Sequence, residues 1–198
     1  MINPVIEAIS NRRSVRAYEP KPIPREIINT LIEAGNQAPS TYPFQPWRFV
    51  VVEDPDFKQK LVQATLPFWK KSFESMEENP EFSDYYAKAK KLYEVMDEPK
   101  DMVYYSAPII LFVIGPARNT VSCALACENI MIAAQSFGLG CCYVGFGSLV
   151  KGDADVVKAL ELTDDEQIYG PIVLGYLKDL PEERALRTKK KGPTVKWI

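Results

Sequence analysis

One segment past the middle of the chain, residues 120–140, constrains the fold more than any other. It reads TVSCALACENIMIAAQSFGLG, and Asn119 stands just before it, where a helix-capping residue is expected. Apolar residues surround nearly the whole of the helix that this sequence predicts, whereas a surface helix carries one apolar stripe. We therefore expect this helix to be buried, either in the core or against a partner subunit.

Four apolar segments predict the strands of a sheet. WRFVVVE at 47–53 is too apolar to be an exposed edge, and APIILFVIG at 107–115 is the second clear strand. CCYVGF at 141–146 predicts a third short strand or strand-like turn. GPIVLGYL at 170–177 predicts the fourth.

Helical segments separate these strands. The pattern predicts helices at 4–11, from Pro24 to Gly35, and at 55–66, because prolines stand in the first turns and Gly35 is placed to end the second helix. One or two amphipathic helices are expected within residues 67–105. This arrangement favours a layered α/β or α+β fold.

The organisation of the chain predicts a single domain. Its 198 residues are enough for one substantial core, and they contain no internal repeat and no linker. We expect one domain over 1–198, with a variable helical segment at 67–105 and a basic C-terminal extension at 180–198. Because no stretch resembles a signal peptide or an uninterrupted membrane span, we expect a cytoplasmic protein.

Charge and composition exclude several function classes. The formal net charge is −2, so the protein has no overall basic field for nucleic acid. The chain contains no histidine, which removes Ser-His-Asp catalysis, Cys-His nucleophiles and most zinc sites. The cysteines favour free thiols, with a redox or metal role as the alternative; they are Cys123, Cys127, Cys141 and Cys142.

Positive charge is concentrated in RRSVRAYEP, residues 12–20. Guanidinium groups are forked donors suited to phosphate, and the serine adds a hydroxyl. Since the cluster follows a short helix, it would bind an anion through side chains more than through a helix dipole. The alternative is a solvated turn whose arginines pair with Glu19 or Glu33.

Two further stretches are candidates for binding. APSTYPFQPWRF at 38–49 predicts a stiff loop with several hydrogen-bonding groups just before a buried strand. GLGCCYVGF at 138–146 contains Gly145, which would let the backbone approach a flat ligand closely. Each has a plain structural alternative: a helix-to-strand connection for the first, and a helix stop or bulge for the second.

The order of these motifs resembles the FMN-dependent nitroreductase family. The motifs are RRSVRAYEPKPIP, APSTYPFQPWRFVVVED, AAQSFGLGCCYVGF and PIVLGY. The resemblance implies an α+β fold with a central mixed, mainly antiparallel sheet flanked by helices, in an intertwined homodimer. It implies a flavoenzyme that passes hydride from NAD(P)H through FMN to a nitroaromatic, a quinone or a similar electrophile. No catalytic side chain and no metal are implied, because the chemistry takes place on the flavin.

The resemblance also implies the cofactor-binding residues. Arg12 and Ser14 would face the phosphate and ribityl chain, with Arg13 beside them, and Arg16 would lie near N1 and O2 of the flavin ring. Gly145 and Phe146 match the position where the backbone approaches N5. The partner chain would contribute Pro39, Ser40 and Thr41, and the tail would complete the phosphate site with Lys189 and Lys191; a solvated lysine run is the alternative for the tail.

The chain departs from the family pattern at Tyr42 and Pro43, where glycine and asparagine are usual. Tyr42 and Phe44 are therefore expected to stack on a ligand or to narrow the substrate pocket. No residue of helix 55–75 is identified that would contact the N3–O4 edge of the flavin. Aromatic residues of the variable segment are candidates for the roof of the pocket, with helix packing or dimer contact as the alternative; they are Phe68, Trp69, Phe73, Tyr85 and Tyr86.

Two other functions remain open from the sequence. Relatives on this fold use reduced FMN for dehalogenation or for oxygen-dependent fragmentation of the flavin. A non-catalytic protein that holds or senses flavin is the third hypothesis. It predicts bound FMN with negligible oxidation of NAD(P)H.

Overall fold

The computed structural model describes residues 3–77, 79–94, 101–178 and 192–198. Its centre is a four-stranded sheet in the order β1-β2-β4-β3, and the three strand pairs are all antiparallel. The strands are β1 (Arg48–Val52), β2 (Ile109–Pro116), β3 (Leu139–Tyr143) and β4 (Glu166–Tyr176). The α+β prediction is confirmed. A parallel bridge between Ser14 and Cys141 adds the N-terminal segment beside β3.

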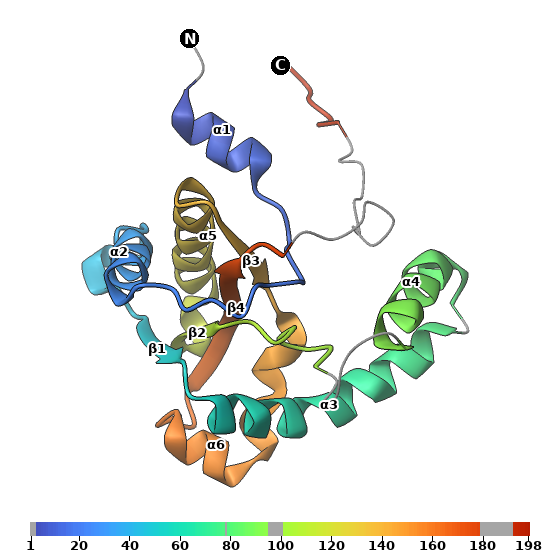
Figure 1. The fold of residues 1–198 in the computed structure, drawn as a ribbon. Coiled ribbons are helices and arrows are strands. Elements are labelled where there is room, and N and C mark those ends of the chain that lie inside the picture. Colours follow the sequence, from blue (N-terminus) through green and yellow to red (C-terminus); the bar gives the residue numbers. More distant parts are fainter. Residues whose placement is uncertain (1–2, 78, 95–100, 179–191) are drawn as a thin grey trace.

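Helices cover both faces of this sheet, as Figure 1 shows. The α-helices are α1 (Pro4–Asn11), α2 (Arg25–Asn36), α3 (Pro55–Glu77), α4 (Ser83–Glu94), α5 (Thr120–Ser136) and α6 (Ala154–Ala159). Shorter 3-10 segments are η1 (Tyr42–Phe44), η2 (Pro80–Phe82), η3 (Ala117–Asn119) and η4 (Gly145–Gly152). No helix in the described part of the chain is long and apolar enough to cross a membrane.

The sheet separates two apolar clusters. Ile110, Phe112 and Ile114 of β2 belong to the cluster that includes residues of α3, η4 and α6. Leu111 and Val113 belong to the other cluster, which includes α2 and α5. Because successive side chains of a strand point to opposite faces, β2 must be apolar throughout. This explains the unbroken apolar run in its sequence.

Helix α5 is buried along most of its length, as its composition predicts. Seven of its residues are buried, among them Cys123, Ala126 and Ile130. Its exposed side carries Val121 at 73% exposure and Leu125 at 41%. The helix therefore packs on the sheet and α2 with one side and presents apolar residues to the outside with the other.

The boundaries of two predicted strands differ from the structure. The third strand was expected at 141–146 but begins at Leu139, which pairs with Tyr176, and ends at Tyr143. Gly138 has a φ of 71° and reverses the chain immediately after α5, so the strand starts earlier than the two glycines suggest. The fourth strand was expected from Gly170 but begins at Glu166. Its first residues pair with the end of β2, beyond a register shift at which Leu111 pairs with Ile172 and Val113 pairs with Tyr169.

Helix α3 was expected to end at residue 66, before Pro67, but it continues to Glu77. Proline costs an interior hydrogen bond and usually ends or kinks a helix. Buried residues on both sides of it, Leu61 and Trp69, anchor the helix on the core. Figure 1 shows the end of α3 together with α4 projecting from one side of the molecule.

Candidate functional site

The basic segment leaves α1 and runs along the edge of β3. Asn3 caps α1 by accepting a hydrogen bond from the Val5 amide at 2.9 Å, and the helix ends where Arg12 begins. The Val15 amide then donates to the Cys141 carbonyl at 2.9 Å. This hydrogen bond fixes the backbone of the segment that carries the three arginines.

The closeness of the segment to β3 depends on a glycine. A Cβ atom on Gly140 would stand 2.8 Å from a side-chain carbon of Val15. A larger residue in β3 would therefore displace the segment. Gly140 allows the backbone of the basic segment to lie directly against the strand.

The side chains of the segment gather around the end of β3. Arg12 is 23% exposed and forms an ion pair with Glu128 of α5 at 3.7 Å. Its partner is thus Glu128 and neither of the two glutamates that the sequence suggested. The Ser14 hydroxyl forms a hydrogen bond with Cys142, and the charge of Arg16 acts on the same thiol. Arg13 is exposed.

Arg16 is half-buried, and its guanidinium carbon lies 5.8 Å from the centre of the Tyr105 ring. This distance is within the range of a cation–π interaction. The positive charge also acts on the buried Tyr18, whose pKa is nevertheless raised because burial disfavours the phenolate. Arg16 therefore stands at the border between solvent and the apolar cluster.

The glycine motif follows directly from the strand that the basic segment flanks. η4 begins at Gly145, two residues after β3 ends. A Cβ atom on Gly145 would meet nothing within 4 Å, whereas one on Gly147 would stand 2.6 Å from Pro171. The space beside Gly145 is open, while Gly147 is locked in the core. Phe146 packs partly against the apolar cluster around α3.

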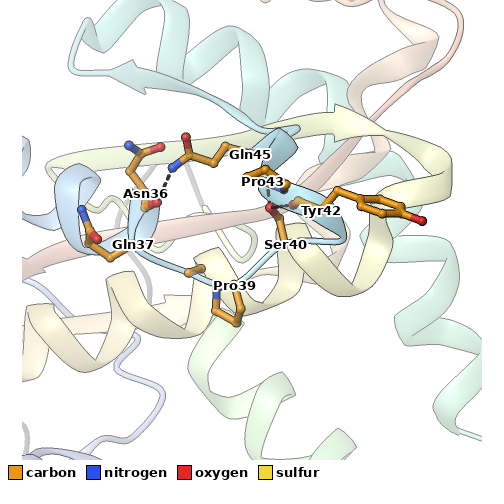
Figure 2. A pocket seen from close by; sticks show the side chains of 8 residues that line it. Asn36, Gln37, Pro39, Ser40, Tyr42, Pro43 and Gln45 are labelled. Carbon is orange, nitrogen blue, oxygen red and sulfur yellow. Dashed lines mark hydrogen bonds between the residues drawn. The ribbon is translucent and has the colours of Figure 1, made fainter.

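The loop between α2 and β1 forms a separate site. It borders a pocket of about 550 Å³, shown in Figure 2; the residues around it are Asn36, Gln37, Ala38, Pro39, Ser40, Tyr42, Pro43 and Gln45. The Ser40 hydroxyl donates to the Tyr42 carbonyl at 2.6 Å and accepts from the Gln45 amide at 3.2 Å. These bonds hold a tight turn in which Tyr42 and Gln45 both have positive φ angles of 52° and 44°.

Two aromatic side chains project from this turn. Tyr42 and Phe44 are 73% and 71% exposed, and their ring centres lie 5.5 Å apart. Figure 2 shows the Tyr42 side chain extending outward from the turn. Large aromatic residues with this exposure are unusual on a rigid turn and are available to a ligand or a partner.

Within one chain, the loop and the basic segment attach to different parts of α5. The Thr41 amide donates to the Ser122 hydroxyl at 3.3 Å, at the start of the helix. Arg12 pairs with Glu128, which is about 9 Å further along the helix axis at 1.5 Å per residue. The residues around the loop pocket include none of the basic segment. The structure therefore brings the basic segment to β3, the strand that leads into η4, and leaves the loop outside this group.

A search of protein-family models matched the nitroreductase family over residues 9–176. The chain belongs to the nitroreductase family.

Nitroreductase relatives resemble this chain over almost its full length. A protein of Methanothermobacter thermautotrophicus, named an NADH dehydrogenase/NAD(P)H nitroreductase, is 26% identical over 98% of this chain and 87% of its own. The crystal structure of a nitroreductase with bound FMN from Bacteroides fragilis superposes with a TM-score of 0.72, at 26% identity and with both chains covered completely. A local match of 47% identity over 55 residues links 28% of this chain to 19% of rat iodotyrosine deiodinase 1.

The aromatic residues proposed for the pocket roof have different surroundings in this protein. Phe68 is 47% exposed, whereas Trp69 is 6% exposed. The Trp69 ring stacks on Phe73 at 4.8 Å, and Phe73 stacks on Tyr86 at 4.5 Å. This stack joins α3 to α4, as expected for helix packing. The side chain of Tyr85 lies outside the described residues.

The four cysteines are free and buried. Burial raises the pKa of the Cys123 thiol to about 11 and the pKa values of Cys127 and Cys141 to about 12, and it also raises that of Cys142. Thiolates, which bind metals and attack disulfides, are therefore scarce at neutral pH. Among the described residues, no group of three possible ligands could hold a metal ion.

Several residues that support the basic segment are not predicted from the sequence. Cys142 contacts Ser14, Glu128 pairs with Arg12, and Tyr105 lies beneath Arg16. These residues are distant in sequence from residues 12–16 and form no motif with them. Only the pairing of that segment with β3 would have indicated Cys142. Lys189 and Lys191, predicted to complete the phosphate site, lie outside the described residues.

Proposed function

We propose that the protein is an FMN-dependent oxidoreductase, which passes hydride from NAD(P)H through FMN to a nitroaromatic, a quinone or a similar electrophilic acceptor. The carrying observation is the basic segment, which is held against β3, the strand that leads into Gly145 and the open space beside it. The names of the relatives, an NAD(P)H nitroreductase and an FMN-bound nitroreductase, support this proposal.

The donors present on the segment suit a flavin phosphate. Arg12 is only partly engaged by Glu128 at 3.7 Å, and a guanidinium has five N–H donors. Together with Arg13 and the Ser14 hydroxyl, it would hold a phosphate and a polyol chain. The open space at Gly145 suits a flat ring, because a side chain there would fill that space. Phe146 would border the same ring.

FMN supplies the chemistry of accepting and donating hydride at the ring when it is bound. The protein would contribute position and charge. Arg16 would hold a fixed positive charge beside the ring edge where negative charge develops on reduction. No side chain is required to act as an acid or a base in this step, so the absence of histidine is compatible with the function.

We infer that the active form is a homodimer whose flavin sites lie at the interface. Apolar side chains are exposed on α1 and on the outer side of α5; they are Val5, Ile6, Ile9, Val121 and Leu125. Exposed apolar side chains on helices that contact each other, as α1 and α5 do, commonly mark an interface. In such a dimer, Pro39, Ser40 and Thr41 would reach the flavin of the other subunit, which agrees with their separation from the basic segment within one chain.

The remaining features follow the same proposal. Tyr42 and Phe44 would border the acceptor from the partner's side, and Phe68 and Trp69 stay as candidates for the roof of the substrate pocket. Lys189 and Lys191 would complete the phosphate site.

We further propose that residues 1–198 act as one domain, with 67–105 near the active site and 180–198 as an extension. A cytoplasmic location agrees with four free thiols.

Reductive dehalogenation is a second candidate. The local similarity to iodotyrosine deiodinase 1 favours it, although that similarity covers 28% of this chain. In this reaction an aryl halide, a proton and two electrons give the arene and a halide ion. Release of iodide from an iodophenol under anaerobic conditions with reduced FMN would support this function. Turnover of nitroaromatics and quinones without halide release would favour the first proposed function, hydride transfer to these acceptors.

The test is anaerobic stopped-flow spectroscopy of the FMN-loaded protein mixed with NADH or NADPH. We expect the flavin absorbance near 450 nm to bleach and then to return when a quinone or a nitroaromatic is added. A protein that binds FMN but remains oxidised with either nicotinamide, and with every acceptor, would instead be a flavin-holding protein. That result would contradict the proposed function.

A further inference from the structure

The turn before β2 contains an unusual backbone conformation. Tyr105 and Ser106 are consecutive residues with positive φ angles of 57° and 51°. This left-handed region favours glycine, and a bulky aromatic residue is seldom found there. Such a conformation persists only where its surroundings enforce it, and it often accompanies function. In this structure, neighbouring side chains hold the turn in this conformation, and the turn directs the Tyr105 ring toward Arg16.

Asp101 enforces the turn from the inside. Its side chain is buried at 6% exposure and accepts three backbone amides: Val103 at 3.0 Å, Tyr104 at 2.6 Å and Ser106 at 2.8 Å. Burial raises the pKa of this carboxyl, and the amide hydrogen bonds oppose that shift. One side chain therefore fixes most of the turn.

Lys58 of α3 holds the far end of the same turn. Its ammonium donates to the Pro108 carbonyl at 2.9 Å and to the Ala107 carbonyl at 3.3 Å. The pKa of Lys58 is lowered because it is partly buried, and the charge of Asp101 opposes that effect. The turn is thus attached to α3 as well as to its own carboxylate. Tyr105 has little freedom to move.

The rigid turn presents the Tyr105 ring to Arg16. The ring is half-buried against the apolar cluster around α3, and its centre lies 5.8 Å from the guanidinium carbon. An aromatic face attracts a cation without consuming its N–H donors. The ring can therefore orient Arg16 through its face, without forming a hydrogen bond to the guanidinium.

We propose that Tyr105 is a positioning residue for Arg16 and that it keeps the guanidinium directed at the edge of the flavin ring. This inference rests on the proposed function, since it assigns Arg16 to the edge where negative charge develops. Arg12, Arg13 and Ser14 would retain the phosphate without Tyr105. Loss of the ring should therefore slow flavin reduction while leaving FMN affinity nearly unchanged.

Tyr105→Gly tests the proposal without straining the backbone. Glycine adopts a φ of 57° freely, so the turn remains compatible with its fold while the ring is removed. Tyr105→Phe keeps the aromatic face and removes only the hydroxyl. The matched control is Tyr176→Gly, which removes another ring beneath a cation: Lys21 lies 4.1 Å from its centre.

The readouts are the rate constant of flavin reduction, the flavin midpoint potential, the dissociation constant for FMN and the melting temperature. In Tyr105→Gly we expect the reduction rate to fall about three- to tenfold and the potential to become more negative. FMN affinity should change less than twofold, because the substitution leaves the residues proposed to bind the phosphate intact. Tyr105→Phe and Tyr176→Gly should keep the reduction rate and the potential of the wild type.

Three results would overturn the proposal: an unchanged rate and potential in folded Tyr105→Gly, an equal loss in Tyr176→Gly, or an equal loss in Tyr105→Phe. If Tyr105→Gly does not fold, Tyr105→Asn replaces it, since asparagine tolerates the same φ. Failure of the wild type to bind FMN would instead contradict the proposed function. The two failures are therefore distinguishable.

Discussion

Arg48 and Glu166 show how single residues stabilise the sheet on which the site is built. The Arg48 guanidinium donates to both Glu166 carboxylate oxygens, at 2.8 and 2.9 Å, and to the Leu160 and Glu161 carbonyls at 2.9 Å. It thereby joins β1 to the start of β4. The hydrogen bonds from Arg48 hold the pKa of Glu166 at about 2, well below its usual value.

A pH dependence of stability follows from that lowered pKa. The native state favours the ionised carboxylate, so its contribution is complete above the ordinary pKa near 4.5 and is lost as the pH falls toward 2. Glu166→Gln removes the charge that pairs with Arg48 and should lower the free energy of unfolding at pH 7 by about 2 kcal/mol. Solvent screening limits the loss to this size, because the pair is partly exposed. Urea unfolding followed by circular dichroism from pH 7 to pH 2 measures this effect.

The control is Asp155→Asn, which breaks the more exposed ion pair with Lys60. This variant should unfold nearly as the wild type does at every pH. The difference between Glu166→Gln and the wild type should shrink steadily below pH 4.5. If the difference in the free energy of unfolding stays constant down to pH 2, the ionised carboxylate of Glu166 is not the source of the stabilisation.

At the scale of elements, much of the fold could be predicted because the apolar patterns are strong. β1, β2 and α5 carry long apolar runs that only burial explains, and all three form within a few residues of their predicted ranges. The start of β3 and the length of α3 depended on tertiary contacts. Gly138 ends α5 as a local signal predicts, but pairing with β4 starts β3 at the next residue. Pro67 is a local stop signal that the packing of Trp69 overcame.

The candidate site was less accessible to sequence than the fold. The basic segment and the glycine motif were recognisable because their residues are close together in the chain. Their juxtaposition depends on the bridge between Ser14 and Cys141, and the support from Tyr105 depends on a strained turn held by Asp101. Contacts between residues this far apart have no signature in a single sequence.

Substitution of two glycines of η4 by alanine should have different effects: one variant should lose stability, and the other should lose affinity for FMN. Gly147→Ala would place a Cβ atom 2.6 Å from Pro171 and 2.7 Å from Tyr104. We expect it to lower the free energy of unfolding by about 1–3 kcal/mol through overpacking. Gly145→Ala meets no atom within 4 Å, so stability should change little while the added methyl enters the space proposed for the flavin ring.

Thermal unfolding of the FMN-free proteins and FMN titration separate the two effects. Gly145→Ala should keep its melting temperature and bind FMN more weakly. Unchanged FMN affinity in a folded Gly145→Ala variant would show that the flavin ring does not lie beside this glycine.

At the scale of the whole molecule, the exposed apolar surface of α1 and α5 predicts the oligomeric state. A charge introduced at Leu125 would be buried in a dimer without a partner, which costs several kcal/mol. Leu125→Asp should therefore sediment as a monomer at concentrations where the wild type is a dimer, and it should lose FMN. Sedimentation velocity with absorbance detection at 280 and 450 nm reports both.

Phe82→Asp serves as the control, because this exposed aromatic lies on the arm formed by α3 and α4. It should leave the sedimentation coefficient and the bound FMN unchanged. A wild-type protein that binds FMN as a monomer would contradict the interface proposed for Pro39, Ser40 and Thr41.

The most direct test of the central claim is a fluorescence titration of FMN with the FMN-free wild type, Arg12→Ala and Arg25→Ala. Arg25 is a matched arginine that pairs with Glu53 on the surface, away from β3. We predict saturable binding by the wild type and by Arg25→Ala, and a dissociation constant about 10- to 100-fold higher for Arg12→Ala. Wild-type protein that leaves FMN fluorescence unchanged, or an Arg12→Ala variant that binds FMN as tightly as the wild type, would contradict the account.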